Sequence, residues 1–379
     1  MLLFLVIPLI MSSCIQKKQQ REVKQYTIEQ FMDNISIFGS SFSSEEEKVL
    51  FTSNESGIYN AYEVSVEGGD PKQLTKREET TRALSYFPND KRIILMSDKG
   101  GNELYHIYVR QENGNIKDIT PYEKARSSFL GWAHDRESFF FASNKRDPRY
   151  MDYYEVPLRT MEAKRIYKNT EGYNLGAISN DTKWLAFSKT ITSTNNNMYL
   201  YNRESKEMKL LSKHEGEATY YPVDFTADNK FLYYRTDKNS EFDYLSKMNL
   251  ETGASEKIYE ADWDVMYVSH SYNKKYRVIG INRDAQTVVK VFNMETGKEV
   301  NFPDFENKNV TSVNISESED LMAFYVSGSK SPGNLYVYNF NTGDYNKLTN
   351  TLNPDINTKD LVEEEVVHYE SFDGMEIPA

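Results

Sequence analysis

The sequence is poor in the residues that build disulfides and metal sites. Cys14 is its single cysteine, so no disulfide framework can form within the chain. Its five histidines are scattered, and no two of them stand at the spacing of metal ligands. We therefore expect no metal centre and no cofactor. The histidines are His106, His134, His214, His270 and His368.

Clusters of positive charge are also missing. Lys+Arg 45 against Asp+Glu 57 gives a net charge of −12, and basic residues never gather into a long run. A nucleic-acid partner requires clustered positive charge, so this composition argues against one. The chain is 39% hydrophobic and 27% charged, which is typical of a soluble globular body.

The apolar segment at the start, Met1–Ile10, is too short for a membrane-spanning helix, which needs about 20 apolar residues. Its length fits the apolar core of an export signal. Small residues and then Cys14 follow, in a pattern that resembles the lipobox of bacterial lipoproteins. That resemblance implies a lipoprotein signal peptide over residues 1–14, with a diacylglyceryl group on Cys14. The alternative is a structural cysteine behind an ordinary signal peptide. Either reading predicts an exported protein, and the first a cell-envelope lipoprotein, periplasmic or on the outer surface.

What the sequence does contain is a repeat. A polar turn, a Lys or Arg and a strand of apolar and aromatic residues recur every 44 to 47 residues. Seven residue pairs mark the repeat, and all but Arg277-Val278 are wholly apolar: Val49-Leu50, Ile93-Ile94, Phe139-Phe140, Trp184-Leu185, Phe231-Leu232, Arg277-Val278 and Leu321-Met322. Such a period indicates stacked, similar units rather than a single mixed core.

Each unit reads as four short strands. A Tyr-rich strand follows the marked one, and in the second unit this strand includes Leu104-Tyr105. Next comes a glycine turn such as Gly68-Gly69 or Thr252-Gly253, then an outer strand ending Leu74-Thr75 or Leu348-Thr349. Four strands at this period are typical of propeller blades. We therefore predict an all-β fold, a seven-bladed β-propeller of four-stranded antiparallel blades over residues 35–350.

Two segments flank the predicted ring. Residues 15–34 read as a polar tether and a short helix, with Thr27 and Gln30 forming a capping box and Phe31 giving an apolar face against the edge of the ring. Residues 351–379 read as a linker and a truncated hairpin around Asp373-Gly374. A lone hairpin is unstable in water, so we expect these to be the first strands of a further domain.

The tail Val366–Ala379 resembles the segment that opens the hydrolase domain in the prolyl oligopeptidase family of serine peptidases, in its bacterial dipeptidyl and acylaminoacyl peptidase-like branch. Asp98–Tyr105 resembles the propeller repeat that these peptidases share with the Tol-system propeller, and Ser143–Asp147 resembles a blade loop of this branch. In that family a β-propeller precedes an α/β-hydrolase domain. The resemblance therefore implies that this chain is the propeller half and lacks the hydrolase domain.

No catalytic residue can be assigned on this basis. The family's nucleophile lies in a Gly-x-Ser-x-Gly elbow, which the sequence lacks, and His368 precedes any such elbow, so the chain alone should be inactive. In some relatives propeller carboxylates bind the amino end of the substrate. The blade loops offer four charged candidates for such a role: Asp147, Arg149, Glu241 and Asp243. The sequence singles out none of them, so the substrate-binding residues stay unassigned.

Two functions follow from these observations. The first is the substrate-gating propeller of an exported, lipid-anchored serine peptidase, acting on oligopeptides through a hydrolase domain absent from this chain. The alternative is a stand-alone envelope propeller that binds protein or glycan partners. A propeller glycosidase would need a cluster of inward carboxylates, which the sequence does not show above background.

Overall fold

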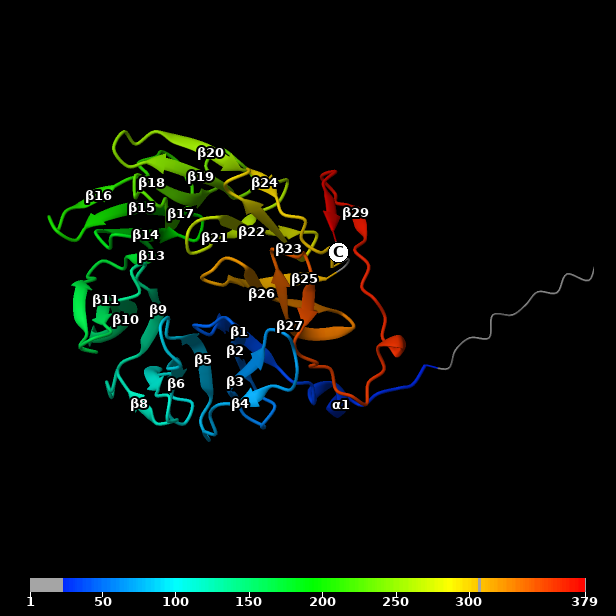
Figure 1. Ribbon diagram of the computed structural model, residues 1–379. Coiled ribbons are helices and arrows are strands. Elements are labelled where there is room, and N and C mark those ends of the chain that lie inside the picture. Colours follow the sequence, from blue (N-terminus) through cyan, green and yellow to red (C-terminus); the bar gives the residue numbers. More distant parts are fainter. Residues whose placement is uncertain (1–22, 306–307, 379) are drawn as a thin grey trace, which may run out of the picture.

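The structure is a computed structural model that describes residues 23–305 and 308–378. Within these ranges the chain forms seven four-stranded antiparallel sheets, arranged as the blades of a ring (Figure 1). The predicted seven-bladed β-propeller is thus confirmed. Cys14 and the predicted signal peptide lie outside the described residues.

Each blade uses four strands that follow one another in the sequence. Blade 1 contains β1 (Ile37–Phe42), β2 (Lys48–Ser53), β3 (Asn60–Ser65) and β4 (Lys72–Gln73). Blade 2 contains β5 (Thr81–Tyr86), β6 (Ile93–Ser97), β7 (His106–Arg110) and β8 (Ile116–Asp118). Blade 3 contains β9 (Ser127–Trp132), β10 (Ser138–Asp147), β11 (Tyr150–Pro157) and β12 (Lys164–Tyr167). Blade 4 contains β13 (Asn174–Ile178), β14 (Trp184–Thr192), β15 (Asn195–Asn202) and β16 (Met208–Leu210).

The remaining blades repeat the plan. Blade 5 contains β17 (Tyr220–Phe225), β18 (Phe231–Thr236), β19 (Tyr244–Asn249) and β20 (Ser255–Tyr259). Blade 6 contains β21 (Val265–His270), β22 (Tyr276–Arg283), β23 (Gln286–Asn293) and β24 (Lys298–Glu299). Blade 7 contains β25 (Asn309–Ile315), β26 (Leu321–Gly328), β27 (Ser331–Asn339) and β28 (Tyr345–Lys347).

The residue pairs that mark the repeat all lie in the second strand of a blade. Such a strand is hydrogen-bonded on both sides and is covered by a neighbouring blade on each face. In β6, Ile93, Ile94 and Leu95 are accordingly all buried. This double burial explains why these strands read as continuous apolar runs rather than as alternating ones.

The Leu-Thr and related pairs lie just beyond the fourth strand, where the hydroxyl takes over a strand hydrogen bond. Strand β4 ends at Gln73, and Thr75 Oγ1 then accepts a hydrogen bond from Ala61 N at 2.9 Å. The same bond recurs from Ile107 N to Thr120 Oγ1 at 2.8 Å, from Met198 N to Ser212 Oγ at 2.7 Å and from Leu335 N to Thr349 Oγ1 at 2.9 Å. A side chain that can bond to the backbone is needed at this position, which accounts for the recurring Thr or Ser.

One predicted strand begins later than expected. The Tyr-rich strand of blade 2 was predicted to include Leu104-Tyr105, but β7 starts at His106. Glu103 has a φ of 59°, and its N–H donates to an Asp98 carboxylate oxygen at 2.9 Å. This turn holds the chain out of the sheet until His106.

The first strand of each blade, which we call its inner strand, contains a bulge at a similar height in the ring. In β1 the pairing with β2 shifts between Phe38 and Ser41, and in β25 the pairing with β26 shifts between Thr311 and Asn314. The other five inner strands show the same irregularity. Bulges bend a strand and increase its twist, so they help the sheets to pack radially around a channel.

The hydrophobic core is divided into seven clusters, each shared by two neighbouring blades. Between blades 3 and 4, for example, the rings of Tyr153 and Phe187 lie 5.6 Å apart. No blade can bury its faces without both neighbours, so the ring is stable only when it is closed.

The ring closes between blades 7 and 1 through side chains, because each of these blades keeps its own four strands. Phe51 and Leu335 belong to the apolar cluster that the two blades share. Tyr325 Oη donates to Gly39 O at 2.6 Å, and Asn314 Nδ2 donates to Ser40 O at 2.7 Å. We call this contact the seam.

The helix α1 (Ile28–Met32) begins with the predicted capping box of Thr27 and Gln30. None of its residues is buried, and Phe31 is 41% exposed. The expected packing against the ring was therefore wrong: the helix is held by the segment that follows the ring, where Asn353 Nδ2 donates to Gln30 O at 2.9 Å. Across the described ranges, no helix has the length and apolarity to span a membrane.

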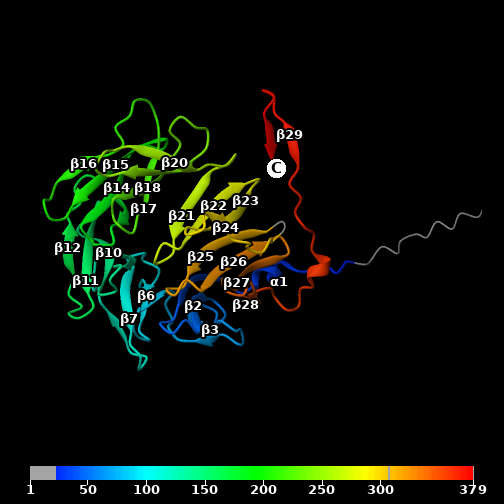
Figure 2. The same cartoon turned by 45° about the horizontal axis from the view of Figure 1, so that its top comes forward.

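After a short 3-10 turn, η1 (Thr358–Asp360), the chain crosses the rim of blades 7 and 6 and forms a hairpin of β29 (His368–Glu370) and β30 (Glu376–Pro378). Lys330 of blade 7 pairs with Glu363 at 2.7 Å, and Asp284 of blade 6 pairs with His368 at 3.1 Å. The hairpin and α1 both lie on one flank of the ring, outside the blades (Figures 1 and 2).

Gly280 in β22 offers a test of the packing between strands. A Cβ atom at this position would lie 2.1 Å from Cε1 of Tyr267 in β21. Burial raises the pKa of Tyr267 to about 12, in keeping with a phenol that is enclosed by protein. We expect Gly280→Ala to lower the free energy of unfolding by about 2 kcal/mol, as overpacking does, in urea denaturation.

Gly333→Ala in β27 is the matched control, since the nearest atoms to its added Cβ would be 3.9 and 4.0 Å away. It should change the free energy of unfolding by less than about 0.5 kcal/mol. Equal losses in the two variants would show that the contact with Tyr267 is unimportant.

Candidate functional site: the central channel

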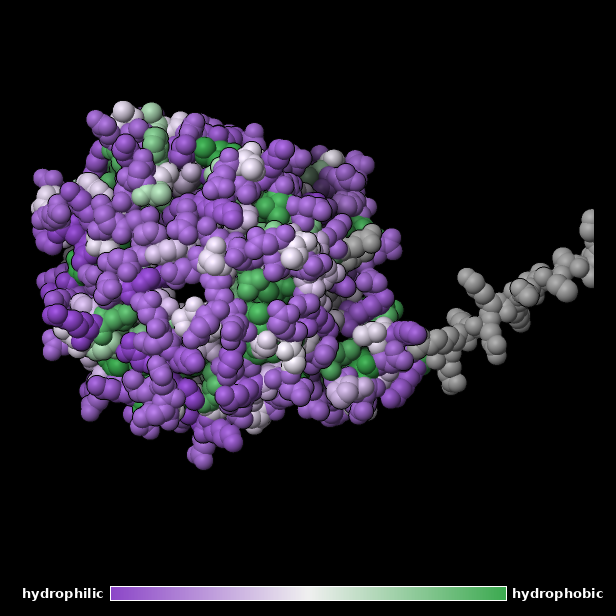
Figure 3. Space-filling model, in the orientation of Figure 1, coloured by the Kyte–Doolittle hydropathy of each residue, from purple (hydrophilic) through white to green (hydrophobic). Residues whose placement is uncertain are grey.

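The ring surrounds a central channel, and a space-filling view shows an opening at its middle (Figure 3). Because the strands of a blade are antiparallel, the turns between first and second strands share one face of the ring, which we call the turn face. The loops between second and third strands share the opposite face, which we call the loop face. Two hollows of about 570 and 310 Å³ lie at the turn face.

Tyr272 of blade 6 reaches across the channel to blade 3. Its hydroxyl donates to the carbonyl oxygen of His134 at 2.6 Å, and its ring stacks on the imidazole with centroids 4.5 Å apart. Arg136 covers the same ring, with Cζ 4.2 Å from the centroid, and pairs with Glu317 of blade 7 at 3.0 Å. We call Tyr272, His134, Arg136 and Glu317 the crossbar. Arg136 and Tyr272 border both hollows, so the crossbar separates them.

A buried polar cluster lies beside the crossbar. His270 Nδ1 lies 3.1 Å from Asp224 Oδ2, Arg277 Nε donates to His270 Nε2 at 3.1 Å, and Lys274 Nζ donates to Asp224 at 2.6 Å. Burial lowers the pKa of His270 even with the carboxylate beside it. Burial opposes the ionisation of Asp224, but the hydrogen bond from His270 and the charge of Lys274 outweigh it and lower its pKa. The cluster therefore holds a neutral histidine between a carboxylate and two cations.

Both groups arise from one repeated turn. In six of the seven first-to-second turns, one residue has a φ between 56° and 65°: Glu46, Arg136, Thr182, Asn229, Lys274 and Glu319. Three of these side chains bond to the turn of the preceding blade: Glu46 to Ser318, Asn229 to Asn180 and Glu319 to Asn273. Lys274 bonds instead to Asp224 in β17, the first strand of the preceding blade. Arg136 lies across the channel instead. Sequence reasoning missed these residues, although aligning the turns at the period of the repeat would have placed all six in one column.

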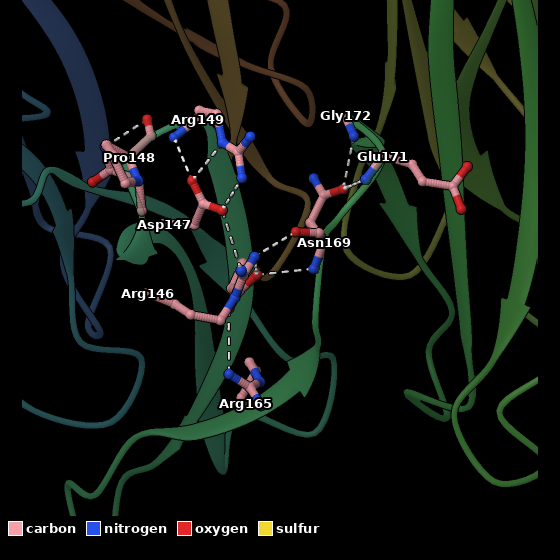
Figure 4. Close-up of polar contacts among 10 residues, drawn as sticks. Arg146, Asp147, Pro148, Arg149, Arg165, Asn169, Glu171 and Gly172 are labelled. Atoms are coloured by element: carbon pink, nitrogen blue, oxygen red, sulfur yellow. Dashed lines mark hydrogen bonds and ion pairs between the residues drawn. The ribbon is translucent and has the colours of Figure 1, made fainter.

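The loop face carries the residues that the sequence offered as substrate-binding candidates. Asp147 lies between two arginines in the loop of blade 3, with Arg149 Nη2 at 2.8 Å and Arg146 Nη1 at 3.6 Å (Figure 4). Hydrogen bonds from Arg149 lower the pKa of Asp147 to about 2. Asp147 is thus neutralised by its neighbours, while the side chain of Arg149 is 74% exposed.

Arg146 is committed to a buried partner. Its Nε and Nη2 donate to the two oxygens of Asp152 at 2.7 and 2.8 Å, and the Asp152 side chain is fully buried. Arg146 also donates to the carbonyl oxygen of Asn169, and Asn169 N donates to Asp152 at 2.8 Å (Figure 4). This loop is therefore held by a bidentate ion pair that is structural in its geometry.

The other two candidates lie in the loop of blade 5. Asp243 pairs with Arg235 at 3.0 Å, and burial raises the pKa of Asp243 in spite of that cation. Glu241 is exposed. No hydrogen bond or ion pair joins this loop to that of blade 3 among the described residues. The candidates share a face but do not converge on one site.

The described residues also include no group of three or more His, Cys, Asp or Glu side chains placed to hold a metal ion. His368 was not expected to act as a catalytic base. It lies in the hairpin, and its one described polar partner is Asp284. The channel is lined by groups held in ion pairs and stacked rings, an arrangement suited to binding and shape selection.

Fold and channel together define a channel-forming β-propeller domain. The protein family described as "prolyl oligopeptidase, N-terminal beta-propeller domain" matches this chain over residues 70–351, which is more than half of its length. The chain belongs to this family of propeller domains.

Solved structures agree with the fold. The chain is similar to a structure from an analysis of two prolyl endopeptidases, with a TM-score of 0.69, 16% identity, and coverage of 92% of this chain and 54% of that one. It is also similar to prolyl oligopeptidase B from Galerina marginata without ligand, with a TM-score of 0.67, 15% identity, and coverage of 92% and 55%. For a mutant of the same enzyme bound to a 25-residue macrocyclization substrate, the TM-score is 0.66 and the identity 16%, with coverage of 92% of this chain and 56% of that one. The chain therefore spans about half the length of these proteins. A search of curated proteins gave no match.

Proposed function

We propose that this chain is the substrate-gating propeller of a serine peptidase that acts on oligopeptides. The observation that carries the proposal is the family match over residues 70–351, which places the ring among domains of prolyl oligopeptidases. The solved relatives are about twice as long, and Galerina marginata prolyl oligopeptidase B has been seen with peptides of 25 and 35 residues. A hydrolase domain acting with this propeller would supply the nucleophile that the present sequence lacks.

The flank that carries α1 and the hairpin is the proposed position of that domain. Val362 and Phe372 in the segment after the ring are 82% and 102% exposed, and Ile28 and Met32 of α1 are 74% and 80% exposed. Exposed apolar side chains gathered on one flank mark an interaction surface. A domain seated there and extending over the mouth of the channel would have the channel as one route to its active site, so chains too wide for the channel would be excluded.

Export and lipid anchoring belong to the same proposal. Their support is in the sequence alone, from the apolar run Met1–Ile10 and the small residues before Cys14. The protein would then act on peptides at the cell envelope, on the periplasmic or outer surface. The membrane would be a partner through the two acyl chains of the diacylglyceryl group, because two chains together give stable membrane binding where one does not.

The peptidase assignment is tested by capture from native cells. Antibodies against the propeller should retrieve a serine hydrolase that is labelled by a fluorophosphonate, on the same polypeptide or bound to it. The purified 379-residue chain should neither be labelled nor hydrolyse peptide p-nitroanilides. Labelling of the purified chain, or captured material without a labelled hydrolase, would contradict the proposal and favour the stand-alone binding module.

The anchor is tested separately by metabolic labelling with an alkynyl fatty acid. The wild-type chain should incorporate the label and sediment with membranes. Cys14→Ser should lose the label and appear in the soluble fraction. An ordinary signal peptide predicts that both chains are unlabelled and soluble.

A further inference from the structure

The smaller hollow at the turn face has the composition of a ligand pocket. Its volume is about 310 Å³, at the lower end of the roughly 300–1,000 Å³ typical of such pockets. Leu130 and Phe140 of blade 3 and Leu175 and Ile178 of blade 4 give it an apolar wall. Leu130 is 43% exposed, so this wall is open to the channel.

The opposite wall carries an excess of positive charge. Arg136 of the crossbar and Lys274 of the buried cluster both border the pocket, while Asp224 is the one carboxylate among the residues that line it. Glu317, the ion-pair partner of Arg136, lies outside the lining and is 45% exposed. Among the lining residues, two cations thus stand against one carboxylate, in a protein whose net charge is −12.

The same two cations also act on His134, which borders the pocket. Burial lowers the pKa of His134, and the charges of Lys274 and Arg136 lower it further, so the imidazole that borders the pocket stays neutral. His270, on the other side, is buried and neutral as well. The positive charge at the pocket is therefore carried by Arg136 and Lys274.

We propose that this pocket binds the C-terminal residue of a peptide, with an apolar side chain against blades 3 and 4 and the free carboxylate between Arg136 and Lys274. An apolar wall facing two partly buried cations matches that amphipathic end of a peptide. The guanidinium is already oriented by its contact with Tyr272 and by Glu317, so little side-chain freedom is lost on binding.

The proposal deepens the proposed function, because a peptide held at the turn face would extend through the channel toward the loop face. The pocket would then favour short peptides with free C-termini over internal segments of proteins. Binding of the isolated peptide end does not itself require a hydrolase, so the two proposals can fail separately.

The test measures binding of acetyl-Gly-Gly-Phe and of its carboxamide to the purified chain by calorimetry. The carboxylate should bind at least about tenfold more tightly than the amide, since a charge-assisted pair is lost in the amide. Arg136→Gln, which leaves Lys274 as the one cation beside the carboxylate, should reduce that difference several-fold. Lys230→Gln, a matched loss of charge on an exposed turn-face side chain, should preserve it.

A second variant guards against indirect effects of Arg136→Gln on the crossbar. Leu130→Trp keeps every charge and fills the apolar side of the pocket, so both peptides should lose affinity. Equal affinity for carboxylate and amide, no binding of either at millimolar concentration, or undiminished binding by Leu130→Trp would each overturn the proposal.

Discussion

Arg146→Met is expected to lower the free energy of unfolding by about 3 kcal/mol, the cost of leaving a buried charge without its partner. Asp152 is fully buried and receives two of its hydrogen bonds from Arg146, at 2.7 and 2.8 Å. After the substitution, Asn169 N and the more distant Arg165, at 3.4 Å, are its described polar partners. Chemical denaturation of the wild-type and variant chains measures the loss.

Arg149→Met in the same loop is the matched control. Arg149 also forms a close pair with an aspartate, Asp147, but its side chain is 74% exposed. Exposed ion pairs contribute about 0–1 kcal/mol, so the control should be nearly as stable as the wild type. Similar losses in the two variants would mean that burial of Asp152 does not set the energy of this loop.

The difference between wild type and Arg146→Met should also depend on pH. Burial opposes the ionisation of Asp152, but the hydrogen bonds and charge of Arg146 outweigh it and lower its pKa below 3.8. This stabilisation is present above the unfolded pKa and is lost as the pH falls through the folded one. Without Arg146, burial raises the pKa of Asp152. As the pH falls, Asp152 is therefore protonated earlier in the variant than in the wild type, and protonation removes the unpaired buried charge that destabilises the variant. The gap should therefore be smaller near pH 4 than near pH 7, and a constant gap would exclude this origin.

The repeat could be predicted from the sequence because burial on both faces fixes the composition of each second strand. Ile93-Ile94 and Phe139-Phe140 must be apolar wherever blades stack, so the period is visible without coordinates. The position of Leu104-Tyr105 could not be predicted in this way. There the left-handed backbone of Glu103 and the carboxylate of Asp98 override the β-propensity of the tyrosine.

The channel was less predictable for a related reason. Tyr272 and Arg136 are ordinary turn residues in the sequence, and they meet only because blades 3 and 6 face each other across the ring. The loop charges Asp147 and Asp243 were visible in the sequence, but the structure pairs each of them with an arginine of its own blade. Local charge is readable from sequence, whereas the partner of a charge depends on the closed ring.

The seam between blades 7 and 1 gives the second large effect. Leu335 is fully buried in the apolar cluster that these blades share, and Leu335→Ala should lower the free energy of unfolding by about 3 kcal/mol. Leu245→Ala is the matched control, since Leu245 is equally buried, also in a third strand, between blades 5 and 6. Both variants should lose similar stability in denaturant.

Their hydrogen exchange should differ, because the chain runs directly from blade 5 to blade 6 but not from blade 7 to blade 1. The seam depends on its side chains, on Tyr325 and Asn314, and on flanking bonds such as Ile35 N to Thr351 O at 2.9 Å. Weakening the seam should let the ring open locally. The amides of β2 and β26 should then exchange through an opening whose free energy is well below that of global unfolding. In Leu245→Ala, both sides of the damaged contact stay joined by the chain and by the closed ring, and reclosing an opened contact costs less entropy when its loop is short. Exchange confined to global unfolding in both variants would show that the seam is as strong as a contact within the continuous chain.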